Sequence, residues 1–102
     1  MGMAIQLEDK QGKVLEEISD LESLLARLFP SWEDASFHCL RYIDPWGDTI
    51  FNHLQMDELI SELQRIRATT SIESERAFID AIEGMAMRCK EGEHLYLKFL
   101  GD

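Results

Sequence analysis

The chain has 102 residues, and its 20 acidic side chains outnumber its 10 Lys and Arg, for a formal net charge of −10. Such an acidic chain has no general attraction for nucleic-acid phosphates, so nucleic acid is not expected as a partner. Hydrophobic residues make up 45% of the sequence, too many for intrinsic disorder. No run approaches the ~18 apolar residues of a transmembrane helix, so no membrane association is expected. These properties predict a single domain over residues 1–102.

The cysteines and the N-terminus bear on the cellular compartment. Cys39 and Cys89 lie far apart in the sequence and form no C-x-x-C pair, which favours two reduced, buried thiols over a disulfide framework. Residues 1–6 lack the charged start and apolar run of a secretory signal. Together these features predict a cytoplasmic protein.

The N-terminal third predicts a hairpin and a helix. Apolar and polar residues alternate over 3–7, a turn follows at 9–13 in which Gly12 takes a positive φ, and 14–18 continues as a second strand. A helix is expected next. Its signals are an S-x-x-E capping box, a leucine stripe at helical spacing and a terminating proline. These residues are Ser19 and Glu22, then Leu21, Leu24, Leu25 and Leu28, and finally Pro30.

The middle of the chain predicts a second hairpin. Residues 37–43 are predicted to form a strand with side chains alternating between its two faces, and residues 49–51 are predicted to form a second strand. Between them, Asp44 is suited to start a turn, Pro45 presets φ at its second position, and Gly47 tolerates a left-handed backbone. A glycine bulge within this hairpin is left open.

The last half predicts two helices and a closing strand. The first helix carries an apolar stripe from Met56 to Ile66; the second follows a capping box of Thr70 and Glu73, and Gly92 ends it. Inward apolar and outward side chains then alternate over residues 94–100, which predicts a strand. The order β-β-α-β-β-α-α-β predicts an α+β domain whose mainly antiparallel sheet carries helices on one face. The first or last strand is expected at a sheet edge, where exposed backbone promotes pairing between chains.

Catalytic and metal-binding motifs are missing from the sequence. The chain has no phosphate loop, nucleophile elbow or H-E-x-x-H motif, and its three histidines are not spaced as metal ligands. His38 and Cys39 are neighbours on the expected strand, where adjacent side chains point to opposite faces and cannot form a dyad. We therefore assign no catalytic, metal or cofactor residues, which favours a protein that is not an enzyme.

Two acidic segments, each beside a tryptophan, are candidates for interaction with another molecule. One is the loop after the first helix, and the other is the turn at 44–48, because tryptophan is enriched at interface hot spots. Ordinary turn chemistry, with aspartates bonding turn amides, is the alternative explanation. Asn52 and His53 could line a pocket or could cap the following helix. The candidate interaction residues are Trp32, Glu33, Asp34, Asp44, Trp46, Asp48 and His53.

Two stretches resemble known proteins. The run LRYIDPWGDTIFN at 40–52 resembles a signature of small bacterial proteins of uncharacterised function, and HLYLKF at 94–99 is similar to the closing strand of that group. This resemblance implies no activity. Residues 18–30 are similar to the first helix of barstar, the acidic inhibitor of a basic ribonuclease. Barstar's tyrosine-rich inhibitory segment is missing, since residues 31–35 read SWEDA.

These features favour a non-catalytic module that binds a protein. The net charge has two explanations: it keeps the chain soluble, or it steers association with a basic protein. Neutralisation of a toxin, as by an immunity protein, is one specific form. One alternative is a self-associating domain, such as a homodimer. The other is a small-molecule-binding protein with a site near the 44–53 hairpin.

Overall fold

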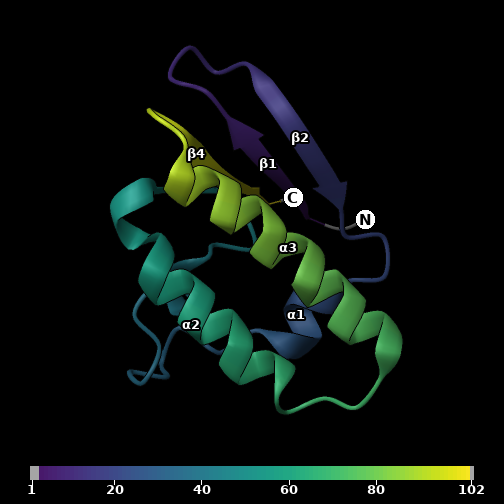
Figure 1. Ribbon diagram of the computed structural model, residues 1–102. Helices are drawn as coiled ribbons and strands as arrows, with labels where there is room; N and C mark the ends of the chain where they lie inside the picture. Colours follow the sequence, from purple (N-terminus) through teal and green to yellow (C-terminus); the bar gives the residue numbers. More distant parts are fainter. Residues whose placement is uncertain (1–2, 102) are drawn as a thin grey trace.

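A computed structural model describes residues 3–101, which form one α+β unit, as predicted (Figure 1). Short 3₁₀ turns lie at Leu40–Tyr42 and His53–Gln55. Within the described range, no helix is long and apolar enough to cross a membrane. The elements in chain order are β1 (Ala4–Glu8), β2 (Val14–Ser19), α1 (Leu24–Leu28), β3 (Asp48–Asn52), α2 (Met56–Arg67), α3 (Glu73–Glu91) and β4 (Tyr96–Leu100).

The four strands form one antiparallel sheet in the order β2-β1-β4-β3. The predicted N-terminal hairpin is confirmed, with Gly12 at φ 84° in its turn. The expectation that the first or last strand lies at an edge is wrong, because β1 and β4 are the two central strands. Their inward residues Ile5, Leu7, Leu97 and Phe99 are fully buried. The edges are β2 and β3.

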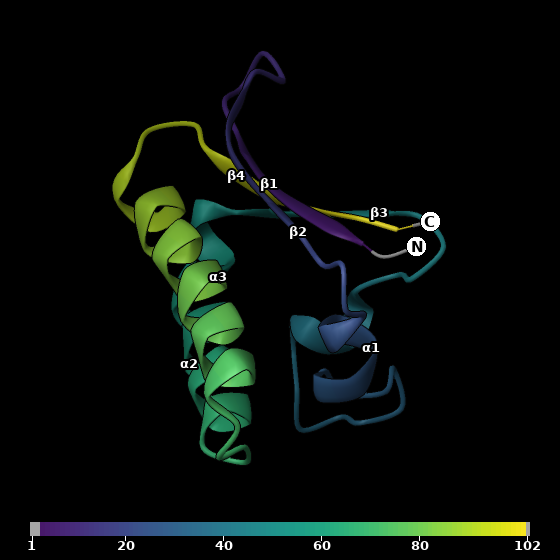
Figure 2. The ribbon, with the colours of Figure 1, turned by 90° about the vertical axis from the view of Figure 1, so that its right-hand side faces the viewer.

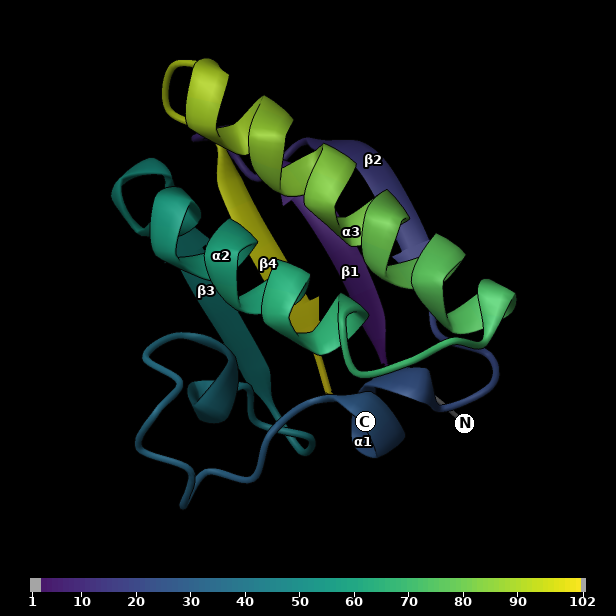
Figure 3. The same cartoon turned by 60° about the horizontal axis from the view of Figure 1, so that its bottom comes forward.

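All three helices lie on one face of the sheet, as predicted (Figure 2). The helices α2 and α3 run side by side beneath the sheet, while α1 lies near its end, close to where β4 finishes (Figures 1 and 3). The predicted apolar stripes of α2 and α3 are confirmed, since each turns buried side chains toward the core. These are Met56, Leu59, Ile60, Leu63 and Ile66 from α2, and Ile79, Ile82, Met85, Ala86 and Cys89 from α3.

The strand predicted over 37–43 is wrong, and so is the second hairpin, since β3 pairs with β4 alone. The reason is Glu62 on α2, whose buried carboxylate accepts N–H groups from three successive residues. His38 donates at 2.6 Å, Cys39 at 3.2 Å and Leu40 at 2.9 Å. These amides satisfy their hydrogen-bonding needs on a side chain instead of a neighbouring strand. The segment therefore curls into a 3₁₀ turn and still buries Phe37, Cys39 and Leu40.

The two predicted capping boxes are also wrong. Ser19 belongs to β2, and α1 begins only at Leu24. The buried carboxylate of Asp20 accepts the N–H groups of Leu24 and Leu25 at 2.7 and 2.8 Å. Leu21 consequently lies outside the helix and is 88% exposed.

The start of α3 shows the same kind of departure from local capping. Ile72 occupies the N-cap position, and no side chain caps the helix there. The hydroxyl of Thr70 instead donates to the buried Glu75 carboxylate at 2.5 Å. The predicted end of α3 at Gly92 is confirmed.

Replacing Glu62 with Gln should lower the free energy of unfolding by about 2–3 kcal/mol, because the amide loses the charge and turns an NH₂ toward backbone donors. Glu58→Gln is the matched control, one turn earlier on α2 and exposed. It should change stability by no more than ~0.5 kcal/mol. Urea unfolding of both variants measures the difference. Equal stabilities for E62Q and the wild type would contradict the role assigned to Glu62.

Candidate interaction groove

A groove of about 930 Å³ lies between α1 and the segment 40–46. Leu25, Ala26 and Phe29 contribute to its apolar lining. Three aromatic side chains that line it are largely open to solvent: Trp32 is 71% exposed, Tyr42 62% and Trp46 79%. Large aromatic side chains in such surroundings are typical of binding surfaces rather than of a closed core.

Arg41 ties two walls of the groove together. Its Nε donates to the carbonyl oxygen of Trp32 at 2.8 Å, which links the 31–36 loop to the 40–42 turn. Its guanidinium carbon lies 5.0 Å from the centroid of the Tyr42 ring, within the range of a cation–π contact. The guanidinium of Arg41 is therefore already engaged within the fold.

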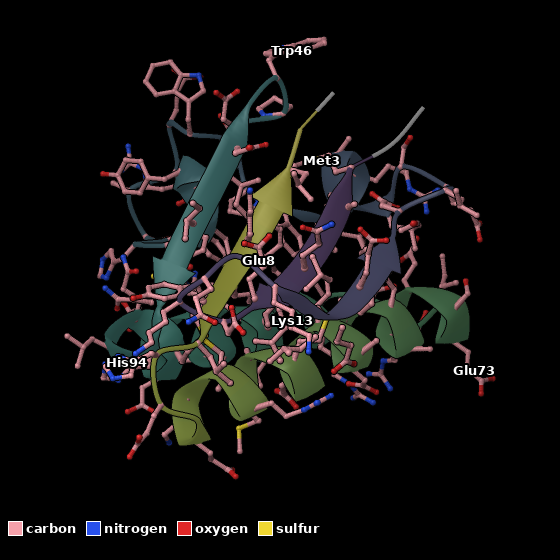
Figure 4. All side chains as sticks on the ribbon, turned by 90° about the horizontal axis from the view of Figure 1, so that it is seen from above. Met3, Glu8, Lys13, Trp46, Glu73 and His94 are labelled. Carbon is pink, nitrogen blue, oxygen red and sulfur yellow. The ribbon has the colours of Figure 1, made fainter. Side chains whose placement is uncertain are left out.

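The turn that carries Trp46 is fixed by its own side chains. The carboxylate of Asp44 accepts the Trp46 N–H at 2.9 Å, and the Asp44 N–H donates to the Thr49 hydroxyl at the same distance. This is the turn chemistry expected from the sequence. Trp46 stands at the tip of the turn, at the opposite end of the sheet from His94 (Figure 4).

The C-terminal end of β4 packs directly against this turn. The Gly101 N–H donates to the Gly47 carbonyl oxygen at 2.8 Å. A Cβ at Gly101 would lie 2.6 Å from the nitrogen and from the oxygen of Gly47, a distance that real Cβ atoms do not adopt. The absence of a side chain at Gly101 thus lets the end of β4 fix the base of the Trp46 turn.

The loop after Trp32 is held from α2. Arg65 donates to the carbonyl oxygen of Ser36 at 2.8 Å, and its guanidinium carbon lies 4.0 Å from the Phe37 ring centroid. Within the loop, hydrogen bonds from the hydroxyl and the N–H of Ser36 lower the pKa of Asp34. Asp34 is therefore ionised at neutral pH, and its hydrogen bonds with Ser36 fix the turn that follows Trp32.

The structure brings together only part of the predicted interaction set. Trp32, Asp44 and Trp46 line the groove, and Glu33 and Asp34 directly follow Trp32 in the chain. Asp48 begins β3, where it lies 3.8 Å from Lys98. His53 follows the other end of β3 and is not among the residues that line the groove.

Asn52 has a capping role, the alternative that the sequence left open. Its side chain accepts the Leu54 N–H, and Gln55 reaches back to the Asn52 N–H, both at 2.9 Å. His53 is exposed within this capped turn.

Sequence reasoning missed Tyr42 and Arg41 as groove residues. On the expected strand they would lie on opposite faces. The 3₁₀ turn instead places both along the groove. The only available signal was an aromatic and an arginine directly before the Asp44 turn.

One cluster has the spacing of metal ligands. A His38 ring nitrogen and the carboxylates of Glu58 and Glu62 lie within 4.8 Å of one another. The Glu62 carboxylate, however, already accepts three backbone N–H groups, which point their partial positive charge at its oxygens. The ring of His38 is in turn 2.5 Å from Glu58. The cluster is explained by these contacts: Glu62 holds the backbone of the 38–40 segment on α2, and Glu58 forms an exposed pair with His38 that adds little stability.

Comparison of the chain with protein-family models, curated proteins and solved structures finds no match. The resemblance of the run at 40–52 to small bacterial proteins stays a prediction. In the structure this run has two parts. Residues 40–46 line the groove, and residues 48–52 form β3.

Gly101→Ala should lower the free energy of unfolding by about 1–3 kcal/mol, because the new methyl group would overlap the Gly47 backbone. It should also shift the Trp46 emission by moving the turn. Gly84→Ala is the control, since an exposed position in α3 with open space should gain about 0.5–1 kcal/mol. Urea unfolding followed by tryptophan fluorescence measures both effects. A G101A variant as stable as the wild type would show that the turn does not depend on this close approach.

The two thiols should be inert in the folded protein. Burial raises the pKa of Cys39 and of Cys89 to about 11, and the Glu62 and Glu58 carboxylates add to the effect at Cys39. A raised pKa keeps each thiol protonated, so reaction with an aromatic disulfide reagent at pH 8 should be about a hundredfold slower than for a free thiol. In denaturant, both thiols should react with the reagent at the rate of free cysteine. A native protein that reacts as fast as the denatured one would contradict this.

Proposed function

We propose that the protein is an acidic, cytoplasmic, non-catalytic module that binds a partner protein through the groove between α1 and residues 40–46. The observation that carries the proposal is the exposure of three aromatic side chains, Trp32, Tyr42 and Trp46, around one apolar groove. Leaving such large apolar surfaces in water is unfavourable, and covering them with a partner recovers that free energy. Trp, Tyr and Arg are also the residue types enriched at interface hot spots.

The rigidity of the groove supports the same proposal. Glu62 and Arg65 of α2 hold the segments on either side of Phe37, and Gly101 supports the Trp46 turn from β4. A surface fixed in this way loses little conformational entropy when a partner binds. The net charge of −10 would steer association toward a basic protein. Inhibition of a basic toxin is the specific form that fits an acidic domain without catalytic groups.

Trp32→Ala combined with Trp46→Ala should abolish specific capture of the partner. Immobilised wild type and variant would be incubated with lysate of the source cells at low and at high salt, and the retained proteins identified by mass spectrometry. We expect a protein retained by the wild type whose affinity falls at least about tenfold in the double variant, because truncating hot-spot residues has effects of this size.

Leu54→Ala serves as the matched control for this capture experiment. Leu54 is 79% exposed, the same as Trp46, but it follows the opposite end of β3. The control removes exposed apolar surface without touching the groove, so it should retain the same partner as the wild type. If the double variant and the wild type retain the same proteins at both salt concentrations, the groove is not the binding surface.

A further inference from the structure

We infer that the partner presents an arginine or lysine side chain, which stacks on the exposed indole of Trp32 or Trp46 and is neutralised by the carboxylate of Asp44. This inference deepens the proposed function and rests on it, because it names the chemistry of the segment that enters the groove. Three features of the groove lead to it: the carboxylate oxygen of Asp44 that has no hydrogen bond within residues 3–101, the open aromatic faces, and the acidic residues next to lining residues in the sequence.

The charged side chains that line the groove differ in what remains available to a ligand. Among the described lining residues these are Asp20, Arg41 and Asp44. Both carboxylate oxygens of Asp20 accept N–H groups of α1, and Arg41 is bonded to Trp32. The exposed Asp44 bonds the Trp46 N–H through one oxygen, and its other oxygen has no hydrogen bond within the described residues. A cation entering the groove therefore meets an available carboxylate two residues from an indole.

The aromatic faces are also unequally available. The guanidinium of Arg41 already lies over Tyr42, whereas Trp32 and Trp46 are 71% and 79% exposed. Tryptophan is the best cation–π partner among the aromatic residues, and a desolvated contact is the strongest kind. The chain uses the same interaction internally, where Arg65 stacks on Phe37. The two indoles are thus the faces on which an incoming guanidinium or ammonium would be stabilised.

The surroundings favour a cationic peptide over other ligands with planar or apolar groups. Glu22, Glu33 and Asp34 flank lining residues in the sequence and are exposed. With the overall charge of −10, they repel nucleic-acid phosphates and anionic lipid headgroups. The same charges attract a basic peptide and raise its rate of association.

The test uses an octapeptide of alternating arginine and alanine, titrated into the full chain. Trp32 and Trp46 are the only two tryptophans, and both line the groove, so tryptophan emission reports on this surface alone. The matched ligand replaces each arginine with citrulline, which has nearly the same shape but no charge. A third peptide carries glutamate in place of arginine. Trp32→Phe and Trp46→Phe variants show which indole is contacted.

We expect the arginine peptide to change the emission saturably and to bind at least about tenfold more tightly than the citrulline peptide. Asp44→Asn should weaken binding about fivefold. Glu93→Gln removes the same charge beside His94, at the other end of the sheet, and should change binding less than about twofold. The glutamate peptide should not bind, and raising the salt concentration should weaken binding of the arginine peptide.

Three results would overturn the inference. The first is equal affinity for the arginine and citrulline peptides, and the second is no saturable response to the arginine peptide. The third is an equal loss of affinity in D44N and E93Q, because a general attraction to the acidic surface would then explain binding without a specific role for Asp44. None of these results affects the capture experiment with the tryptophan double variant, so failure of this inference and failure of the proposed function can be told apart.

Discussion

The buried carboxylate of Glu62 is the interaction on which the irregular half of the molecule depends. Residues 29–47 contain no strand and no α-helix, yet they bury Phe37, Cys39 and Leu40 against the core. A buried backbone without a ladder would leave amides unpaired, which is unfavourable. Glu62 accepts three of these N–H groups from α2. This contact fixes where the 3₁₀ turn lies, and with it the positions of Arg41 and Tyr42 along the groove.

Two other buried acids act in the same way, so part of the acidic composition is structural. Asp20 holds the first N–H groups of α1, and its own N–H donates to Met3 beside β1. Glu75 accepts the Thr70 hydroxyl and pairs with Arg27, which connects α3 to α1. Because α1 is a single turn, it depends on these contacts more than on helix propensity. The wall of the groove that α1 supplies is therefore held by carboxylates at both ends.

The elements that the sequence predicted correctly are those in which burial follows a local period. Alternation in β1 and β4, and the apolar stripes of α2 and α3, depend on neighbours one to four positions away. The strand expected at 37–43 is wrong because two adjacent residues, Cys39 and Leu40, are both buried, and because the N–H groups of this segment bond to Glu62, more than twenty positions later. The two expected capping boxes failed for a related reason. Asp20 and Glu75 offer buried carboxylates that compete with the local capping pattern.

The candidate site was predictable to the extent that it lies in turns. Trp32, Asp44 and Trp46 were identified because tryptophan is enriched at interface hot spots and here lies in acidic turns, but only the fold shows that they line one groove. The fold also divides the acidic residues that make up the net charge into two groups. Acids such as Asp20, Glu62 and Glu75 are used inside the fold and are hidden from a partner. Asp44 remains exposed in the groove that two open indoles line, so under the proposed function it is here that the excess of acid acts as a local feature.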